Sequence, residues 1–140
     1  MARVNAFGFE DAIKGIYAEL EQFPQIREKM LIEGGKRLAE EVQMQMLMYG
    51  VRDLGTTYDS INHGEVQYAA GGSFIEVWPR GMRKKDKNHR KSIRNAMVAF
   101  LVEYGTSTTQ ARPFMSAAVK EAADDVAEVM MEVWKGRDKQ

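Results

Sequence analysis

Residues 66–78 read VQYAAGGSFIEVW, and apolar side chains alternate with polar or small ones along both halves of this segment. Alternation of this kind is typical of a β-strand with one buried face. The pair Gly71-Gly72 separates the two halves and predicts a two-residue hairpin turn. Because two strands alone are only marginally stable, we expect a third or fourth strand. Residues 57–62 are a candidate for this third strand or for a short turn of helix.

The alternation also predicts the register of the hairpin. Three pairs of residues should face each other: Ala70 with Ser73, Tyr68 with Ile75, and Val66 with Val77. One face of the hairpin is then consistently apolar, as a well-specified register requires. The opposite face carries Phe74 and Trp78, together with polar neighbours. We expect a helix or a neighbouring subunit to cover part of this face, which makes Phe74 and Trp78 candidates for an oligomer interface.

Two helices are predicted before the hairpin, and Pro24 separates them. The first is short, with apolar residues at Phe9, Ile13, Ile16 and Leu20. The second is longer, and its apolar stripe consists of Ile26, Met30, Gly34, Leu38, Val42, Met46 and Tyr49. The pair Gly34-Gly35 predicts either a kink or the close approach of another backbone. Gly50 is expected to end this helix.

Two more helices are predicted after the hairpin. Residues 92–104 favour a helix capped by Ser92, with a buried face made of Ile93, Met97, Phe100, Leu101 and Tyr104. A strand stays open as the alternative for 97–102, because periodicity alone does not assign so short an apolar run. Pro113 opens the last helix, whose buried stripe is expected to be Phe114, Ala118, Ala122, Val126, Val129 and Val133. Residues 136–140 are expected to be a frayed polar tail.

The predicted fold class is therefore α+β: a small antiparallel sheet, made of the hairpin plus one or two further strands, packed with about four helices. The length of 140 residues predicts a single domain over 1–140. Apolar residues also lie off the main stripes, at Met44, Met48 and Met131. Such residues indicate a second covered surface and hence oligomerisation.

The composition excludes several classes of protein. The chain has no cysteine, which excludes a disulfide scaffold, a cysteine-based zinc site and a thiol nucleophile. No apolar run is long enough to span a membrane, and the first residues lack the apolar core of a signal peptide. We therefore expect a protein of the cytoplasm, or of a particle assembled there, without membrane contact. The formal net charge of +0 removes any global attraction to nucleic acid.

Nothing in the sequence indicates an enzyme. The two histidines, His63 and His89, lie in polar surroundings and lack metal-ligand spacing. The chain has no phosphate-binding glycine loop, no dinucleotide-binding motif and no nucleophile elbow. We expect no catalytic residue, no metal and no cofactor.

Charge is unevenly distributed along the chain. Between residues 83 and 94 a single acid accompanies seven cations, which are Arg83, Lys84, Lys85, Lys87, Arg90, Lys91 and Arg94. This segment is predicted to contain a flexible, solvated loop over 83–91, and its cations are candidates for contact with a subunit or with DNA. It has no aromatic residue on which bases could stack. The last helix presents an acidic face, and this candidate complementary surface is made of Glu121, Asp125, Glu128 and Glu132.

Two motifs carry a family resemblance. Residues 102–107 read VEYGTS, and residues 111–115 read ARPFM directly before the last helix. Upstream, residues 55–61 read GTTYDSI. Together they resemble the Hong Kong 97-type tail-completion, or head–tail joining, family of long-tailed phages and prophages. That family typically shows a V-E-aromatic-G-T turn, an A-R-P-F helix start and an upstream T-G-x-L-x-x-S-I. The third motif is degraded here, because Tyr58 stands at the leucine position and the preceding proline is missing.

The motif residues have structural readings of their own. The set consists of Glu103, Tyr104, Gly105, Thr106, Arg112, Pro113 and Phe114. Gly105 permits a tight turn after a helix. Arg112 is expected either to satisfy backbone carbonyls or to pair with an acid, for which Glu103 is the obvious candidate. An ion pair between these two would brace the loop over 105–112.

The resemblance implies a structural protein without catalysis. It implies a virion-assembly subunit at the neck of a tailed phage or prophage, which completes the tail or joins the head connector to the tail tube. The expected partners are further copies of the chain in a hexameric or dodecameric ring, the head connector or adaptor, and the tail tube or tail terminator. DNA would pass through the lumen without sequence recognition. The implied location is the virion, with assembly in the host cytoplasm. The alternative reading is a small nucleic-acid-binding module that uses the basic segment over 83–94.

Overall fold

The computed structural model describes residues 2–5, 23–51, 55–83 and 92–136. Within these ranges the chain is α+β, as predicted. Four helices are present there: α3 (Pro24–Met48), α4 (Gly55–Asp59), α5 (Asn95–Tyr104) and α6 (Phe114–Lys135). The main sheet contains β1 (Ala2–Asn5), β2 (Ile61–His63), β3 (Gln67–Ala69) and β4 (Gly72–Pro79). A second pair is formed by β5 (Met82–Arg83) and β6 (Ile93–Arg94).

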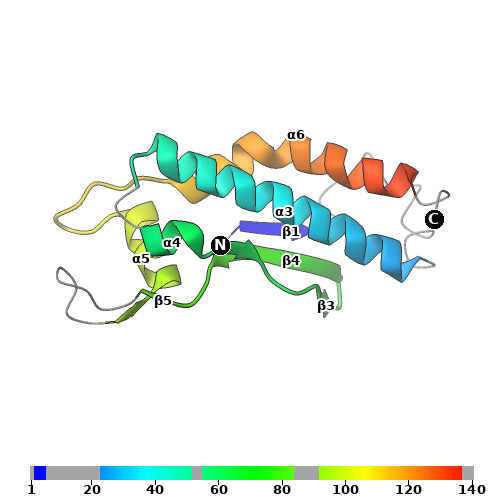
Figure 1. The fold of residues 1–140 in the computed structure, drawn as a ribbon, viewed down its shortest axis with the longest axis horizontal. Helices are drawn as coiled ribbons and strands as arrows, with labels where there is room; N and C mark the ends of the chain where they lie inside the picture. The colour runs from blue at the N-terminus through cyan, green and yellow to red at the C-terminus, as the bar shows by residue number, and fades with distance from the viewer. Residues whose placement is uncertain (1, 6–22, 52–54, 84–91, 137–140) are drawn as a thin grey trace.

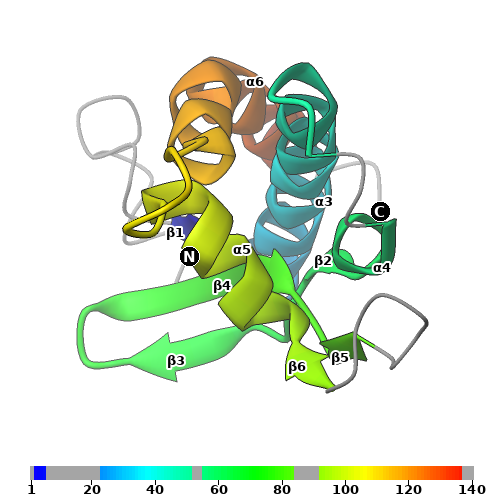
Figure 2. The ribbon, with the colours of Figure 1, turned by 90° about the vertical axis from the view of Figure 1, so that its left-hand side faces the viewer.

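The molecule has two layers, with α3 and α6 lying side by side over one face of the sheet (Figures 1 and 2). The two helices run antiparallel. Phe23, just before α3, meets Trp134 near the end of α6 at a ring distance of 6.2 Å. The core fills the space between the layers, and α5 closes one end of the molecule.

Helix α3 forms where its apolar stripe predicts, and Pro24 occupies its first turn. The helix is continuous through Gly34-Gly35, so no kink forms there. A Cβ atom on Gly35 would lie 3.0 Å from the Cβ atom of His63 and 3.3 Å from Cγ2 of Ile75. The glycine therefore lets α3 pack closely onto the sheet. After the helix, Gly50 has a φ of 68°, as expected of a helix-ending glycine.

Strand β4 is the centre of the main sheet, because β1, β2 and β3 all pair with it in antiparallel orientation. Its burial alternates along the whole strand: Ser73, Ile75, Val77 and Pro79 are buried, and the residues between them are half-buried. The predicted apolar face of this strand is confirmed. It points toward the two long helices.

The predicted hairpin register is wrong by two residues. Tyr68 pairs with Ser73 and Ala69 with Gly72, so Ala70 and Gly71 form the turn. The reason is competition for β4, since His63 of β2 takes the position opposite Val77 that was predicted for Val66. A shift of two residues keeps each side chain on its predicted face. The register is supported at α3, where the Tyr68 hydroxyl donates to Glu28 and the guanidinium of Arg27 lies 5.8 Å from the Tyr68 ring centre.

Both structures proposed for residues 57–62 are present in part. Helix α4 ends at Asp59, and Ser60 closes it through a hydroxyl bond of 2.7 Å to the carbonyl of Thr57. Strand β2 then starts at Ile61, which is buried. The short segment thus turns the chain from α3 back onto the edge of β4.

Helix α6 begins at Phe114 with Pro113 at its N-cap, as predicted. Its core residues include Phe114, Ala118, Ala122 and Val126, whereas Val129 and Val133 are only half-buried. The deep positions in the second half are Met130 and Trp134. The deep positions keep a four-residue step from Phe114 to Trp134, so the buried stripe drifts around a helix with 3.6 residues per turn, whereas the prediction stepped three residues from Val126 to Val129.

Three predictions fall on residues that the structure does not describe. These are the first helix over 9–20, the basic loop apart from Arg83, and the polar tail after Gly136. In the parts of the chain that are described, no helix combines the length and the apolar character that a membrane span requires.

Candidate interface around helix α5

Helix α5 shows the clearest departure from its predicted orientation. The segment is a helix, so the strand alternative for 97–102 is wrong, and it begins at Asn95 without a side-chain cap from Ser92. The predicted buried face points outward: Met97 is 50% exposed, Phe100 58%, Leu101 39% and Tyr104 66%. These four side chains are called the α5 face below. The buried side consists instead of Asn95, Val98, Ala99 and Glu103.

Asn95 fixes the start of α5 through a buried polar network. Its backbone amide donates to the carbonyl of Gly81 over 3.0 Å, and its side-chain amide donates to the carbonyl of Arg80 over 2.7 Å. The hydroxyl of Thr57 donates to the Asn95 side-chain oxygen over 3.2 Å. Buried polar groups need such partners, and these three bonds are directional. They account for the orientation of the helix, because they pull its Asn95 side into the protein.

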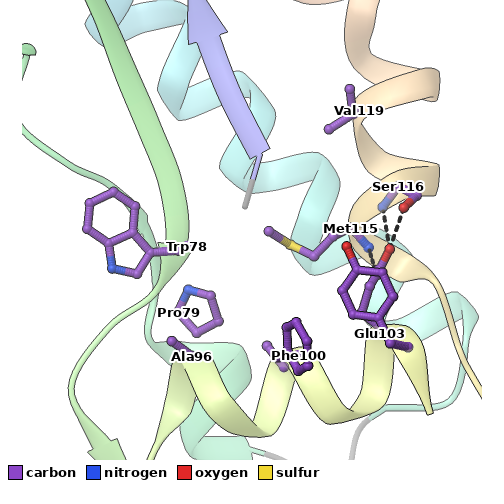
Figure 3. Close-up of a pocket in the computed structure, with 10 residues that line it drawn as sticks. Trp78, Pro79, Ala96, Phe100, Glu103, Met115, Ser116 and Val119 are labelled. Atoms are coloured by element: carbon purple, nitrogen blue, oxygen red, sulfur yellow. Dashed lines mark hydrogen bonds between the residues drawn. The ribbon is translucent and has the colours of Figure 1, made fainter.

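Glu103 fixes the other end of α5 to the start of α6. Its carboxylate accepts bonds from the amide of Met115 over 2.8 Å and the amide of Ser116 over 3.1 Å, and also from the Ser116 hydroxyl. The first amides of a helix lack partners within the helix, and this end favours negative charge. The buried carboxylate of Glu103 thus acts as the cap of α6 (Figure 3).

The predicted ion pair between Glu103 and Arg112 is wrong, because α6 uses both carboxylate oxygens of Glu103. Arg112 follows the other predicted course and satisfies a backbone carbonyl: its Nη1 donates to Gly50 over 3.1 Å. Its own amide donates to the carbonyl of Val102 over 2.8 Å. Arg112 therefore connects the end of α3 to the α5–α6 link.

Gly105 makes the tight turn that leaves α5, as predicted. Its φ is 75°, and a Cβ atom there would lie 2.7 Å from the carbonyl oxygen of Thr109 and 2.8 Å from the amide of Ala111. Thr106 closes the loop, since its hydroxyl accepts the amide of Thr109 over 3.0 Å. Close backbone contacts and a positive φ together require glycine at this position.

A groove of about 400 Å³ runs along one side of the α5 face (Figure 3). Phe100 and Tyr104 contribute one wall from α5, and their ring centres are 4.8 Å apart. Met115, Ser116 and Val119 of α6 form the opposite wall, and Trp78 and Pro79 lie at the end of β4. The one carboxylate among the lining residues, that of Glu103, is already bonded to α6.

A second groove of about 270 Å³ flanks the other side of the α5 face. Leu101 contributes to it from α5, and Val51 lies at the end of α3. Arg83 and Arg112 also line it. The α5 face therefore stands as a ridge between two grooves, one largely apolar and one with two cations.

Three cations of the described residues lie around the α5 face. Arg94 is exposed immediately before α5, and Arg83 and Arg112 line the second groove. None of these three arginines forms an ion pair with a carboxylate in the described ranges. The other predicted contact residues, Lys84, Lys85, Lys87, Arg90 and Lys91, lie outside those ranges.

Of the two aromatic residues proposed for an interface, only Trp78 reaches this region. It is half-buried, lines the first groove, and carries the guanidinium of Arg80 at 4.3 Å from its ring centre. Part of the predicted cover thus comes from the chain itself. Phe74 is half-buried toward the other end of β4, opposite Asn5 and Gln67.

The predicted acidic face of α6 is exposed at all four positions, Glu121, Asp125, Glu128 and Glu132. Asp125 also serves within the chain by pairing with Arg37 of α3 at 2.7 Å. Burial opposes the charge on Arg37, but the bonds and charges of Asp125 and Glu41 outweigh it and raise the pKa of Arg37. The bond helps to set α6 against α3.

The arrangement offers an exposed apolar surface between two grooves. Among the described residues no cluster of histidine and acidic side chains could hold a metal ion. Sequence reasoning missed the outward face, although a signal existed: α5 carries apolar residues on both sides, at Val98 and Ala99 as well as at Phe100 and Leu101. A helix that is apolar all round needs cover on every side.

Comparisons of the chain with protein-family models, with curated proteins and with solved structures gave no match.

Proposed function

We propose that the chain is a structural virion-assembly protein of a tailed phage or prophage. In this proposal it is a ring-forming subunit at the neck, which completes the tail or joins the head connector to the tail tube. The observation that carries the proposal is the α5 face, which leaves four large apolar side chains exposed between two grooves. Apolar surface gathered in this way is typical of protein–protein contact.

The roles of the motif residues support the same proposal. Glu103 caps α6, Gly105 makes the turn, and Arg112 holds the end of α3. Each of these contacts braces the scaffold that presents the α5 face. A structural role of this kind is what the resemblance to tail-completion proteins implies for them.

The proposal assigns the chain to the neck or tail region of the virion, with assembly in the host cytoplasm. Its partners would be further copies of itself, the head connector or adaptor, and the tail tube or tail terminator. DNA would cross the lumen of the ring without being read. A ring of identical subunits needs two unlike surfaces on each copy, because its contacts are head-to-tail.

The test is the state of the purified chain in solution. We expect a discrete assembly in sedimentation equilibrium, and a ring with a central hole in negative-stain electron microscopy. Phe100→Ser should shift the chain to monomers without loss of its circular dichroism signal, because Phe100 is exposed. A chain that stays monomeric at every concentration, and that binds duplex DNA with a steep salt dependence, would contradict the proposal and support a nucleic-acid-binding module.

A further inference from the structure

We propose that the α5 face of one copy binds a pair of methionines, Met44 and Met48 on α3, of a second copy. This inference rests on the proposed function, because it names the two unlike surfaces through which copies would join. The pair is called the methionine ridge below. Three observations carry it: the exposure of the ridge, the charges around both surfaces, and the unsuitability of either surface for pairing with itself.

The methionine ridge is an exposed apolar feature near the end of α3. Met44 is 52% exposed and Met48 is 72% exposed. The two residues are four apart, so they lie on one side of the helix, whereas Val42 and Met46 point into the core. Methionine side chains are unbranched and flexible, and they adapt to irregular apolar grooves. The ridge is therefore suited to the grooves that flank the α5 face.

The register of α3 and α6 brings an acid of α6 to nearly the level of the ridge, and α3 carries a second acid. Arg37 contacts Asp125, and the helices run antiparallel, so positions after Arg37 lie level with positions before Asp125. Glu121 is one turn back from Asp125 and therefore lies within about one or two turns of Met44 along the helix pair. Glu40, exposed one turn before Met44, flanks the ridge on its own helix. Neither acid forms an ion pair with a described residue.

The two surfaces have opposite charge at their rims. Arg83 and Arg94 lie beside the α5 face, and Glu40 flanks the methionine ridge. Arg112 borders both surfaces, because it lines the second groove and donates to Gly50, two residues after Met48. When the ridge of one copy meets the α5 face of another, Arg83 and Arg94 face the acids beside the ridge. Complementary charge of this kind favours one partner and one orientation over others.

The same charges disfavour symmetric pairing. If two α5 faces met, the arginines of one copy would face the arginines of the other. If two ridges met, acid would face acid. Like charges across an interface cost free energy, so both symmetric arrangements are penalised. The favoured contact joins unlike surfaces, and such contacts build closed rings or open filaments rather than simple pairs.

Crosslinking tests the contact, because the chain has no cysteine of its own. Two single variants, Met48→Cys and Phe100→Cys, are mixed, one of them with a tag that separates it by size, and treated with a short bis-maleimide. We expect the mixed product to exceed either self-product by at least about tenfold, because the proposed contact is head-to-tail. Lys29→Cys, exposed near the start of the same helix, is the matched control and should not crosslink to Phe100→Cys.

Charge exchange gives an independent readout. Arg94→Glu should weaken association at least about tenfold, since it places an acid against the acids of the ridge. Adding Glu121→Arg on the same chain should restore most of the loss. Both positions are exposed, so folding should be unchanged.

The outcomes separate this inference from the proposed function. Sedimentation reports assembly, and the crosslinks report which surfaces join. Assemblies in which Phe100→Cys couples mainly to itself, or in which neither cysteine couples, would overturn the inference and leave the proposed function standing. A chain that is monomeric at every concentration would overturn both.

Discussion

Helices α5 and α6 are consecutive and both carry many apolar residues, yet they use those residues in opposite ways. Helix α6 turns its stripe toward α3, and Phe114, Ala118 and Ala122 are fully buried. Helix α5 turns Val98 and Ala99 inward and leaves the α5 face in solvent. The sheet, α3 and α6 thus supply most of the core, and α5 adds only its inner side. The outer side of α5 is free to serve another partner.

The free energy available at the α5 face supports assembly rather than tight binding of one partner. Full burial of one large apolar side chain contributes about 1.5–3 kcal/mol. Association itself costs roughly 4–15 kcal/mol in lost freedom. A single α5 contact would therefore give modest affinity, and in the proposed ring, where every copy would make two contacts, closure would add the stability that one contact lacks.

The largest expected effect separates the inner and outer apolar residues directly. Phe114→Ala should lower the free energy of unfolding by about 3–5 kcal/mol, because it leaves a cavity in the core. Phe100→Ala should lower it by less than about 1 kcal/mol, because that ring is already exposed. Urea unfolding of both variants below the association concentration measures the difference. Equal losses would show that α5 is covered within the monomer, and the comparison between the helices would fail.

The next largest loss of stability is expected at Glu103, whose carboxylate caps α6. Glu103→Ala should cost about 3 kcal/mol, because it leaves amides at the start of α6 without an acceptor. Glu103→Gln keeps one acceptor oxygen, so its loss should be about half as large. Thermal and urea unfolding give the values. If Glu103→Gln were as stable as the unsubstituted chain, the charge and the second oxygen of Glu103 would have no part in joining α5 to α6.

The turn between the helices gives a smaller effect with a built-in control. Gly105→Ala should cost about 2 kcal/mol or more, because the conformation is strained and the added methyl would meet the backbone at 2.7 Å. Gly50→Ala also has a positive φ, of 68°, but nothing lies within 4 Å of the added methyl, so about 1 kcal/mol is expected. Unfolding measurements rank the two. The reverse order would mean that the Gly105 loop is free to rearrange.

The smallest effect lies far from the α5 face, at the hairpin. The hydrogen bond to Glu28 raises the pKa of Tyr68 above its ordinary value of 10.0. The bond requires the protonated phenol, so its stabilising contribution is present below pH 10 and is lost as the pH rises through the raised pKa. Titration of carbon-13-labelled tyrosine by NMR should show this shift, and Glu28→Gln should reduce it. A Tyr68 that titrates at or below its ordinary value would place the hairpin tip elsewhere.

Several elements follow from local patterns in the chain. The α3 stripe from Met30 to Met46, the first half of the α6 stripe, the alternation along β4 and the turn at Gly105 appear where the sequence predicts them. The α+β class follows from their order. In each case the deciding forces act between residues that are close in sequence: helix and strand periodicity, the fixed φ of proline and the freedom of glycine.

The errors share one physical cause, which is competition between distant segments. The hairpin register differs from the predicted one because β2, not β3, pairs with Val77. The partner of Glu103 changed because the free amides of α6 compete with Arg112 for its carboxylate. Periodicity gives the two apolar sides of α5 equal rank, so it could not tell which side would be buried.

Residue order was enough to set the helices, the central strand and the apolar faces, because those features depend on spacing along the backbone. Packing in three dimensions chose the register, the partners of Glu103 and Arg112, and the outward turn of α5. That turn follows from the bonds of Asn95 to Thr57 and to the backbone of Arg80 and Gly81. A buried polar side chain must find partners, and the partners lie on segments that only the folded chain brings together.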